Sequence, residues 1–244
     1  MTRWRLIALD MDGTLLGKDG TVSPENKKWI RRAREAGIEV TIATGRPCRM
    51  IRSYLECLDL QVPFVAANGS EVWTMDGSLL ERHTLCHQDI AFLHQLARKY
   101  GTHFWSSVVG EVFKPDTFPE DVERYHWLKF GFKSEDPEII EQLWKRLKSY
   151  GKLECTSSDP TNIEVNPEGV SKATGLQRVC DYLGILPEQV AAMGDGLNDV
   201  AMLRWAGMGF AMGNAPLEVR SSADRVTPPH WEDGVAQAIQ WLLR

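Results

Sequence analysis

The chain has 244 residues, of which 43% are hydrophobic and 25% are charged, so general disorder is excluded and a sizeable folded core is expected. Its 28 Lys and Arg residues against 33 Asp and Glu residues leave a net charge of −5. That sign is wrong for a protein whose main task is to neutralise nucleic-acid phosphates, so we expect no nucleic-acid partner.

The sequence indicates no segment for membrane insertion or export. No run approaches the ~20 uninterrupted apolar residues that cross a bilayer, and the N-terminal stretch reaches Asp10 and Asp12 almost at once. The five cysteines are widely spaced and include no Cys-x-x-Cys pair, which argues against a disulfide framework and a thiolate zinc site. We therefore expect a cytoplasmic protein without membrane contact, while the oligomeric state stays open.

Short apolar runs alternate with amphipathic patterns at both ends of the chain, which predicts an α/β domain with a mainly parallel sheet. Several runs are apolar throughout, as strands covered on both faces require. Strands are predicted at 6–10, 38–44, 64–67, 190–195 and 208–212. Helices are predicted at 24–36, 47–60, 89–100, 137–150, 172–183, 198–206 and 234–243.

The middle of the chain interrupts this alternation. It offers two helical patterns separated by strand-like pieces such as 127–132, without the acidic residues that close the outer strands. We therefore expect an inserted α+β domain at 83–160. The doubly wound sheet domain is then built from 1–82 and 161–244.

Polar residues close three of the predicted strands, where ligands of an open parallel sheet gather. Asp10, Thr44 and Asp195 hold these positions. Asp12 follows Asp10 by two residues, so both carboxylates can point to one side, and Gly13 lets the backbone turn at once.

A second acidic cluster is Gly194-Asp195-Gly196-Leu197-Asn198-Asp199. Asp195 and Asp199 are four residues apart at the start of a helix, which places them on one face. Four carboxylates in one cleft would repel one another unless a cation lay among them, and an all-oxygen ligand set favours Mg²⁺.

Each fragment alone is most simply structural, because an Asp-Gly pair is usually a turn and a single lysine is usually solvated. Their joint placement at strand ends and helix starts favours a functional site. The residues concerned are Asp10, Asp12, Thr44, Lys172, Asp195 and Asp199.

Four segments together resemble the motifs of the haloacid dehalogenase superfamily of phosphatases in order and spacing. They are Asp10-Met11-Asp12-Gly13-Thr14-Leu15, Thr44-Gly45-Arg46, Gly169-Val170-Ser171-Lys172 and the 194–199 cluster. Met212-Gly213-Asn214-Ala215-Pro216 and Trp231-Glu232-Asp233-Gly234-Val235 resemble the Cof-type subfamily, whose α/β cap is inserted between the second and third motifs.

The resemblance implies a mechanism with two carboxylates. Asp10 would be the nucleophile that forms an aspartyl-phosphate, and Asp12 would protonate the leaving alcohol and then activate water. The resemblance also implies a Mg²⁺ ion held by the Asp10 carboxylate, the Asp12 backbone carbonyl and Asp195, with Asp199 in support.

The phosphoryl oxygens would be held by the remaining motif residues. Thr44, the Gly45 amide and Asn198 would donate hydrogen bonds, and Lys172 would supply positive charge to the same oxygens and to Asp10. Arg46 has two interpretations, since it would either contact the non-reacting part of the substrate or pair with an acid of the core.

These features together predict a Mg²⁺-dependent phosphatase acting on small phosphomonoesters such as sugar phosphates, with the inserted domain selecting the substrate. A phosphomutase is one alternative, because it uses the same nucleophile and returns the phosphoryl group to a sugar. A non-catalytic phospho-receiver module is another, although such a module needs neither Asp12 nor a large insertion.

Overall fold

The computed structural model describes residues 3–244, and the chain divides into two compact units. The first unit contains the described residues up to Glu81 together with Ser171–Arg244, and the second contains Arg82–Val170. The sequence placed the boundaries after residues 82 and 160. The first of these lies within one residue of the structural division, and the second lies ten residues before it.

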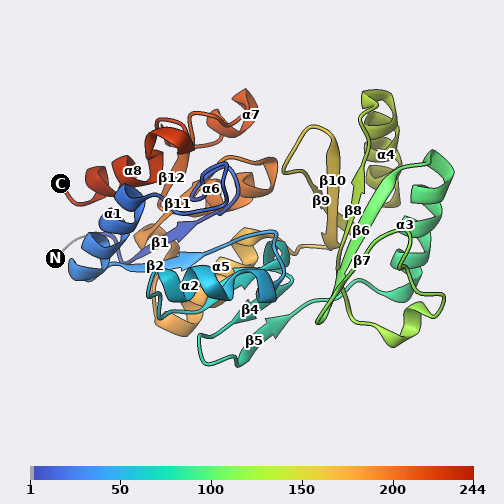
Figure 1. Ribbon diagram of the computed structural model, residues 1–244, viewed down its shortest axis with the longest axis horizontal. Helices are drawn as coiled ribbons and strands as arrows, with labels where there is room; N and C mark the ends of the chain where they lie inside the picture. Colours follow the sequence, from blue (N-terminus) through green and yellow to red (C-terminus); the bar gives the residue numbers. More distant parts are fainter. Residues whose placement is uncertain (1–2) are drawn as a thin grey trace. The chain divides into compact units, whose positions relative to one another are not determined.

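A parallel five-stranded sheet forms the centre of the first unit, in the order β13-β12-β11-β1-β2 (Figure 1). Next to β2, residue Ala43 forms a parallel bridge with Val65 of β3, and β3 also belongs to an antiparallel-paired sheet in the order β3-β4-β5. The strands of this unit are β1 (Leu6–Leu9), β2 (Glu39–Ile42), β3 (Phe64–Ala66), β4 (Glu71–Trp73), β5 (Leu79–Arg82), β11 (Val190–Gly194), β12 (Met208–Ala211) and β13 (Arg225–Val226).

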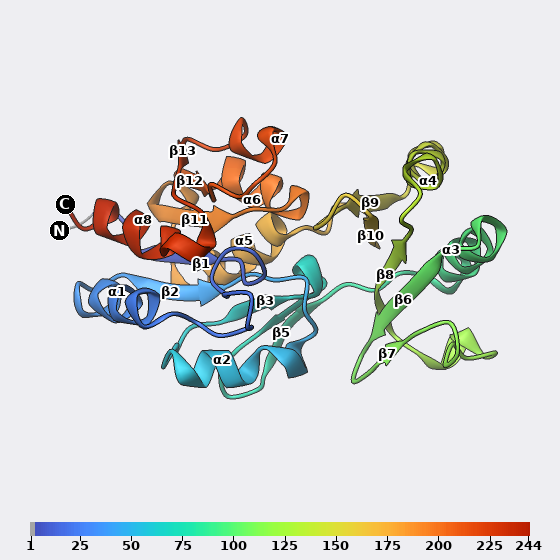
Figure 2. The same cartoon turned by 45° about the horizontal axis from the view of Figure 1, so that its top comes forward.

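Helices cover both faces of the five-stranded sheet, because alternate residues of β1 point to opposite sides. Ile7 and Leu9 pack in one apolar cluster with α1 (Pro24–Glu35) and α8 (Gly234–Leu242). Leu6 and Ala8 pack in another with α5 (Lys172–Leu183) and α6 (Val200–Trp205) (Figure 2). The predicted doubly wound α/β fold is thereby confirmed. The unit also contains α2 (Arg52–Cys57) and α7 (Leu217–Arg220).

Two predicted helices are each divided in the structure. Residues 47–60 form a 3-10 turn at Cys48–Met50 followed by α2, and residues 198–206 form a 3-10 turn at Leu197–Asp199 followed by α6. In the second case the Asp199 side chain accepts the backbone N–H groups of Asp195 and Gly196, which tightens the first turn.

The second unit is an antiparallel sheet in the order β7-β6-β8-β10-β9 with two helices on one face (Figures 1 and 2). Phe104, Phe130 and Phe132 pack with the helices in one apolar core, which confirms the expected α+β class. The elements are α3 (His87–Tyr100), β6 (His103–Val108), β7 (Val112–Phe113), β8 (Trp127–Lys133), α4 (Pro137–Tyr150), β9 (Leu153–Thr156) and β10 (Asn162–Pro167).

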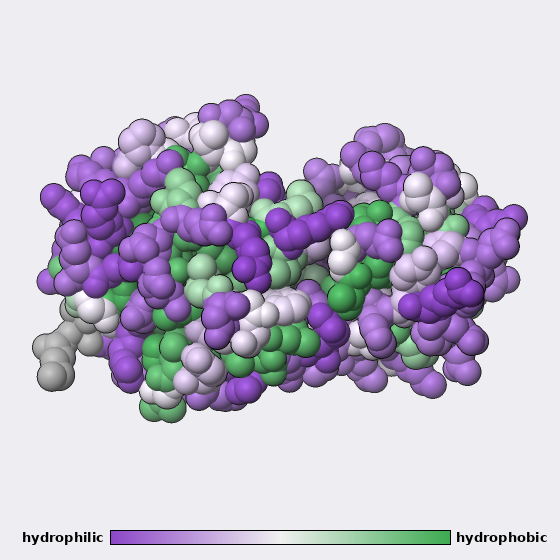
Figure 3. Space-filling model, turned by 60° about the horizontal axis from the view of Figure 1, so that its bottom comes forward, coloured by the Kyte–Doolittle hydropathy of each residue, from purple (hydrophilic) through white to green (hydrophobic). Residues whose placement is uncertain are grey.

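The position of β10 explains the difference at the second boundary. Val165 of β10 pairs with Phe130 of β8, so residues 162–167 belong to the antiparallel sheet and not to the parallel one. The surface in Figure 3 is mostly hydrophilic, with apolar residues in smaller patches. Within residues 3–244, the structure contains no helix with the length and apolar character needed to span a membrane.

Candidate active site

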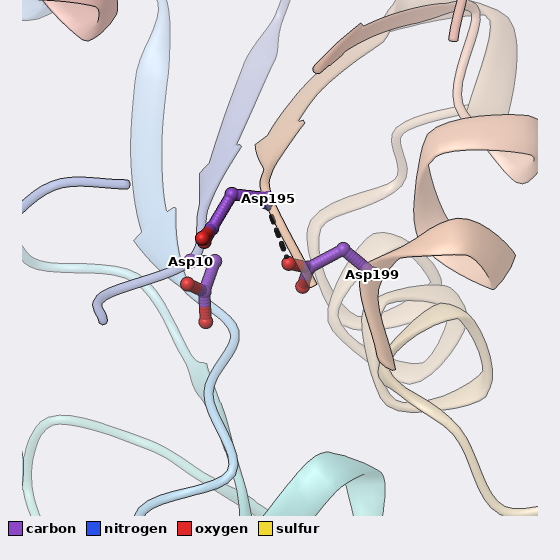
Figure 4. Close-up of side chains that lie close together, drawn as sticks. All are labelled: Asp10, Asp195 and Asp199. Carbon is purple, nitrogen blue, oxygen red and sulfur yellow. Dashed lines mark hydrogen bonds between the residues drawn. The ribbon is translucent and has the colours of Figure 1, made fainter. Parts of the chain in front are cut away.

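The polar residues that close three neighbouring strands lie at one edge of the parallel sheet. Asp10 follows β1, Thr44 lies two residues beyond β2, and Asp195 follows β11. Since β1 pairs with both β2 and β11 in parallel, the carboxyl ends of these strands meet at the same edge. In Figure 4 the Asp195 side chain points toward Asp10, and Asp199 lies beside them on the turn that follows Asp195.

Lys172 lies at the first position of α5 and is fully buried. Its Nζ donates to Asp10 Oδ1 and to Asp199 Oδ1, each at 2.6 Å. The helix start is fixed locally, because the Ser171 side chain accepts the Thr174 N–H and the Thr174 hydroxyl accepts the Ser171 N–H. The local cap fixes the start of α5, so the Lys172 ammonium contacts two buried carboxylates from distant parts of the chain.

Asp199 is the most fully bonded of the carboxylates. Its Oδ2 accepts the N–H groups of Asp195 and Gly196, each at 2.9 Å, and its Oδ1 accepts from Lys172. This bonding suits a residue that fixes the Asp195 loop and the lysine. The supporting position that the family resemblance implies for Asp199 at a metal ion stays a prediction.

Burial and like charge dominate the electrostatics of the cluster. Burial is the largest cause that raises the pKa of Asp10 well above its ordinary value; the charge of Lys172 lowers this pKa, and repulsion from Asp199 and Asp195 raises it. Burial, with repulsion from Asp199, raises the pKa of Asp195 to about 7. Burial alone would lower the pKa of Lys172, but the two carboxylates raise it above the ordinary value. The cluster therefore carries more negative charge than one lysine offsets.

This excess charge fits a divalent cation. Among the described residues, Asp10, Asp195 and Asp199 each offer a carboxylate oxygen, and these oxygens lie within 4.8 Å of one another. A cation between them would offset the repulsion that raises the two pKa values, and an all-oxygen set suits a hard ion such as Mg²⁺. The Asp12 carboxylate is not part of this group.

Asp12 points its carboxylate to Arg46 instead. Arg46 Nε donates to Asp12 Oδ2 at 2.8 Å, and Nη2 donates to Oδ1 at 2.5 Å. The hydrogen bond to Asp12 is the main cause that raises the pKa of Arg46. Of the two interpretations of Arg46, the structure contains the ion pair with an acid of the core.

Thr44 lies on the loop after β2, and Asn198 lies in the 3-10 turn Leu197–Asp199 of the same unit. The Thr44 hydroxyl accepts the Arg46 N–H at 3.2 Å, and Gly45 lies between these two residues on the loop after β2. Asn198 Nδ2 donates to Asn68 Oδ1 at 3.3 Å. The contacts of Asn198 thus involve a residue that the sequence analysis did not single out.

Two further residues hold Asp195, and sequence reasoning assigned a role to neither. The Thr14 hydroxyl donates to Asp195 Oδ1 at 2.9 Å, and Asn214 Nδ2 donates to Oδ2 at 3.1 Å and to the Gly13 carbonyl at 2.9 Å. Gly13 has φ of +79°, and a Cβ there would overlap the Asp195 carboxylate. The only signal in the sequence was that Thr14 and Asn214 belong to the quoted motifs.

The raised pKa of Asp195 predicts a pH effect on stability without divalent cations. The folded state holds this proton up to about pH 7, whereas the unfolded state releases it near its ordinary pKa, so the group's contribution is full at low pH and is lost as pH rises through 7. In EDTA, the wild type should lose about 2 kcal/mol more unfolding free energy than Asp195→Asn between about pH 5 and about pH 8.

Urea unfolding followed by circular dichroism measures this difference. Asp116→Asn makes the same change at an exposed position and should follow the wild type. Parallel pH profiles for the wild type and Asp195→Asn would contradict the prediction.

Comparison with known proteins agrees with this geometry. The family model of haloacid dehalogenase-like hydrolases matches residues 7–130 and 110–239. The 5-amino-6-(5-phospho-D-ribitylamino)uracil phosphatase YcsE of Bacillus subtilis (strain 168) is 45% identical over 240 residues, which cover 98% of this chain and 96% of that protein. The pyridoxal phosphate phosphatase YbhA of Escherichia coli (strain K12) is 28% identical over 264 residues, with coverages of 96% and 97%.

A solved structure described as a haloacid dehalogenase-like hydrolase from B. subtilis matches the fold with a TM-score of 0.89 at 29% identity, covering 97% of this chain and 99% of that one. The family match spans both units, and the curated relatives are named phosphatases. The chain therefore belongs to the haloacid dehalogenase-like hydrolases, in their Cof-type subfamily, and is a phosphatase that hydrolyses phosphoric monoesters.

Proposed function

We propose that this protein hydrolyses a small-molecule phosphomonoester through an aspartyl-phosphate on Asp10, with Mg²⁺ as cofactor. The observation that carries the proposal is the position of Asp10. Its carboxylate directly follows β1, is bonded to the buried Lys172 at 2.6 Å and lies beside two further carboxylates. A buried carboxylate held by a cation at the carboxyl edge of the sheet is suited to attack a phosphorus atom.

The reaction has two steps at the same phosphorus. In the first, an Asp10 oxygen bonds to phosphorus, the bond to the leaving oxygen breaks, and Asp12 gives its proton to that oxygen. In the second, Asp12 takes a proton from water, the water oxygen bonds to phosphorus, and the bond to Asp10 breaks to release inorganic phosphate. Each proton and oxygen is thereby accounted for, and Asp10 and Asp12 return to their starting forms.

The other motif residues hold the phosphoryl group. Lys172 places a positive charge next to the Asp10 carboxylate, and its ammonium also suits the phosphoryl oxygens. Thr44, the Gly45 amide and Asn198 supply hydrogen-bond donors to those oxygens. Fixed donors and charge of this kind are the main contribution of a protein to phosphoryl transfer.

The carboxylates fit the proposed Mg²⁺ ion. Asp10, Asp195 and the Asp12 backbone carbonyl would hold it, and Asp199 would keep the Asp195 loop in place through the two N–H groups that it accepts. When bound, the ion would supply positive charge that reduces the repulsion between the Asp10 carboxylate and the phosphate dianion.

The relative YcsE supports a specific substrate class. It is 45% identical over nearly the whole chain and is named as acting on 5-amino-6-(5-phospho-D-ribitylamino)uracil, so we propose that compound as the substrate. Selection of its organic part is assigned to the second unit. The helix-free face of that sheet carries the half-buried Trp105 over Gly131, and an aromatic side chain suits stacking on a ring.

Phosphate release tests the proposal. Purified protein with Mg²⁺ should release inorganic phosphate from the ribitylamino-uracil ester, and its kcat/KM should be higher there than for sugar phosphates, pyridoxal phosphate and p-nitrophenyl phosphate. EDTA should abolish release, and added Mg²⁺ should restore it. Undiminished release in EDTA would contradict the metal assignment. Isomerisation without free phosphate would favour a mutase, and a stable phosphoprotein without turnover would favour a receiver.

A further inference from the structure

We infer that Arg46 is a positioning residue for the second chemical step, in which it holds the ionised Asp12 carboxylate as the base that activates water. The inference rests on the proposed function, since that assigns the acid and base role to Asp12. It develops the second of the two interpretations of Arg46, the pair with an acid, and departs from the first, contact with the non-reacting part of the substrate.

The ion pair between Arg46 and Asp12 is bidentate. Two nitrogens of the guanidinium, Nε and Nη2, donate to the two oxygens of Asp12 at 2.8 Å and 2.5 Å. Both Asp12 oxygens accept from the guanidinium, so the contact fixes the plane and direction of the carboxylate. Each oxygen keeps a second lone pair for the water that Asp12 activates.

Arg46 is itself held in place by the chain. Its Nη1 donates to Tyr54 Oη at 3.5 Å, and the guanidinium carbon lies 5.6 Å from the centre of the Tyr54 ring. The Tyr54 hydroxyl donates to the Gly20 carbonyl at 3.0 Å. The Arg46 backbone donates to Thr44 Oγ1 and accepts from Ala67. All three guanidinium nitrogens therefore already face acceptors of this protein.

Asp12 needs such support more than the other carboxylates do. Its side chain is 62% exposed, whereas that of Arg46 is 21% exposed, so Asp12 lacks the packing that orients the buried Asp10. It is followed at once by Gly13, which has a positive φ. A base on an exposed side chain loses rate when it samples orientations that do not reach the water, and a fixed partner limits that loss.

The two steps respond differently to loss of this support. With p-nitrophenyl phosphate the leaving phenolate needs no proton, so the first step does not depend on Asp12, whereas the second step always requires the base. Arg46→Ala should therefore lower kcat by about 10- to 100-fold and lower KM in proportion, leaving kcat/KM unchanged. A burst of p-nitrophenol close to one equivalent per active site should precede the slower steady state.

Rapid-mixing absorbance with Mg²⁺ present measures the burst and the steady state together. Arg46→Lys keeps the charge but not the two-pronged contact, so it should lie between Arg46→Ala and the wild type. Tyr54→Phe should give a smaller change in the same direction. Arg31→Ala removes an exposed arginine on α1 and should behave as the wild type. If Arg46→Ala does not fold, the same measurements on Arg46→Lys decide.

A rise in KM at unchanged kcat for Arg46→Ala would overturn the inference and make Arg46 a substrate ligand. Unchanged kinetics, or a fall in kcat/KM without a burst, would also overturn it. Asp12→Ala separates this outcome from failure of the proposed function. If Asp12→Ala shows the p-nitrophenol burst and Arg46→Ala does not, the positioning role of Arg46 is wrong and the aspartyl-phosphate mechanism stands. No burst in either variant, with no phosphorylated protein detectable by mass spectrometry, removes the aspartyl-phosphate mechanism and the inference with it.

Discussion

Replacement of Asp10 by Asn is expected to lower turnover by at least about 10⁴-fold while the protein stays folded. An amide oxygen cannot replace the carboxylate as the attacking group, but the amide has nearly the same shape. The amide side chain would still offer an oxygen to the Lys172 ammonium, which also keeps its bond to Asp199. The variant loses the nucleophile and little of the packing.

The stability of this variant is informative in its own right. Burial, and then repulsion from Asp199 and Asp195, raise the pKa of Asp10 although Lys172 lowers it, so ionising this side chain costs stability in the cation-free protein. Asp10→Asn removes that charge. We therefore expect its unfolding free energy in EDTA to equal or exceed that of the wild type.

Phosphate-release assays and urea unfolding check the two halves of this prediction. Asp116→Asn, at an exposed position of the second unit, should retain wild-type turnover. Turnover of Asp10→Asn near the wild-type rate would remove Asp10 from the role of nucleophile. A marked loss of stability would show that the ionised carboxylate is needed for folding.

Local sequence signals predicted α5 and the strand ends well. The Ser171 cap precedes α5 and Gly184, with φ of +63°, follows it, so both ends are set by neighbouring residues. Asp10, Lys172, Asp195 and Asp199 do lie together, because the parallel order of β11, β1 and β2 brings their carboxyl ends to one edge. The cluster follows from topology, which the alternation of strands and helices already indicated.

Contacts between distant residues were harder to predict. The pairing of β10 with β8 depends on which edge of a sheet is available. The second unit boundary, after Val170, could therefore not be placed from local patterns. The Arg46 side chain pairs with Asp12, which lies 34 positions away in the sequence. Which acid pairs with Arg46 depends on how the loops fold. Asn214 bonds Asp195 and the Gly13 carbonyl, which no spacing rule indicates.

Lys172→Met should have the largest effect on stability of any single change at the site. Methionine matches the length of the lysine stem, but it leaves Asp10 and Asp199 facing each other without the ammonium that each contacts at 2.6 Å. Removing one member of a buried ion pair costs about 3 to 5 kcal/mol, because the remaining charge stays buried. We expect a loss of that size in EDTA at neutral pH, together with loss of turnover.

A double variant separates the two effects. Asp10→Asn combined with Lys172→Met removes one of the two unpaired charges, so part of the lost unfolding free energy should return while turnover stays absent. Lys145→Met is the matched control, since that lysine is 70% exposed and pairs with Glu141 only at the surface, where such a pair contributes at most about 1 kcal/mol. If urea unfolding gave Lys172→Met the stability of the wild type, the lysine would not be offsetting buried charge. The excess negative charge that motivates a divalent cation at this site would then need another explanation.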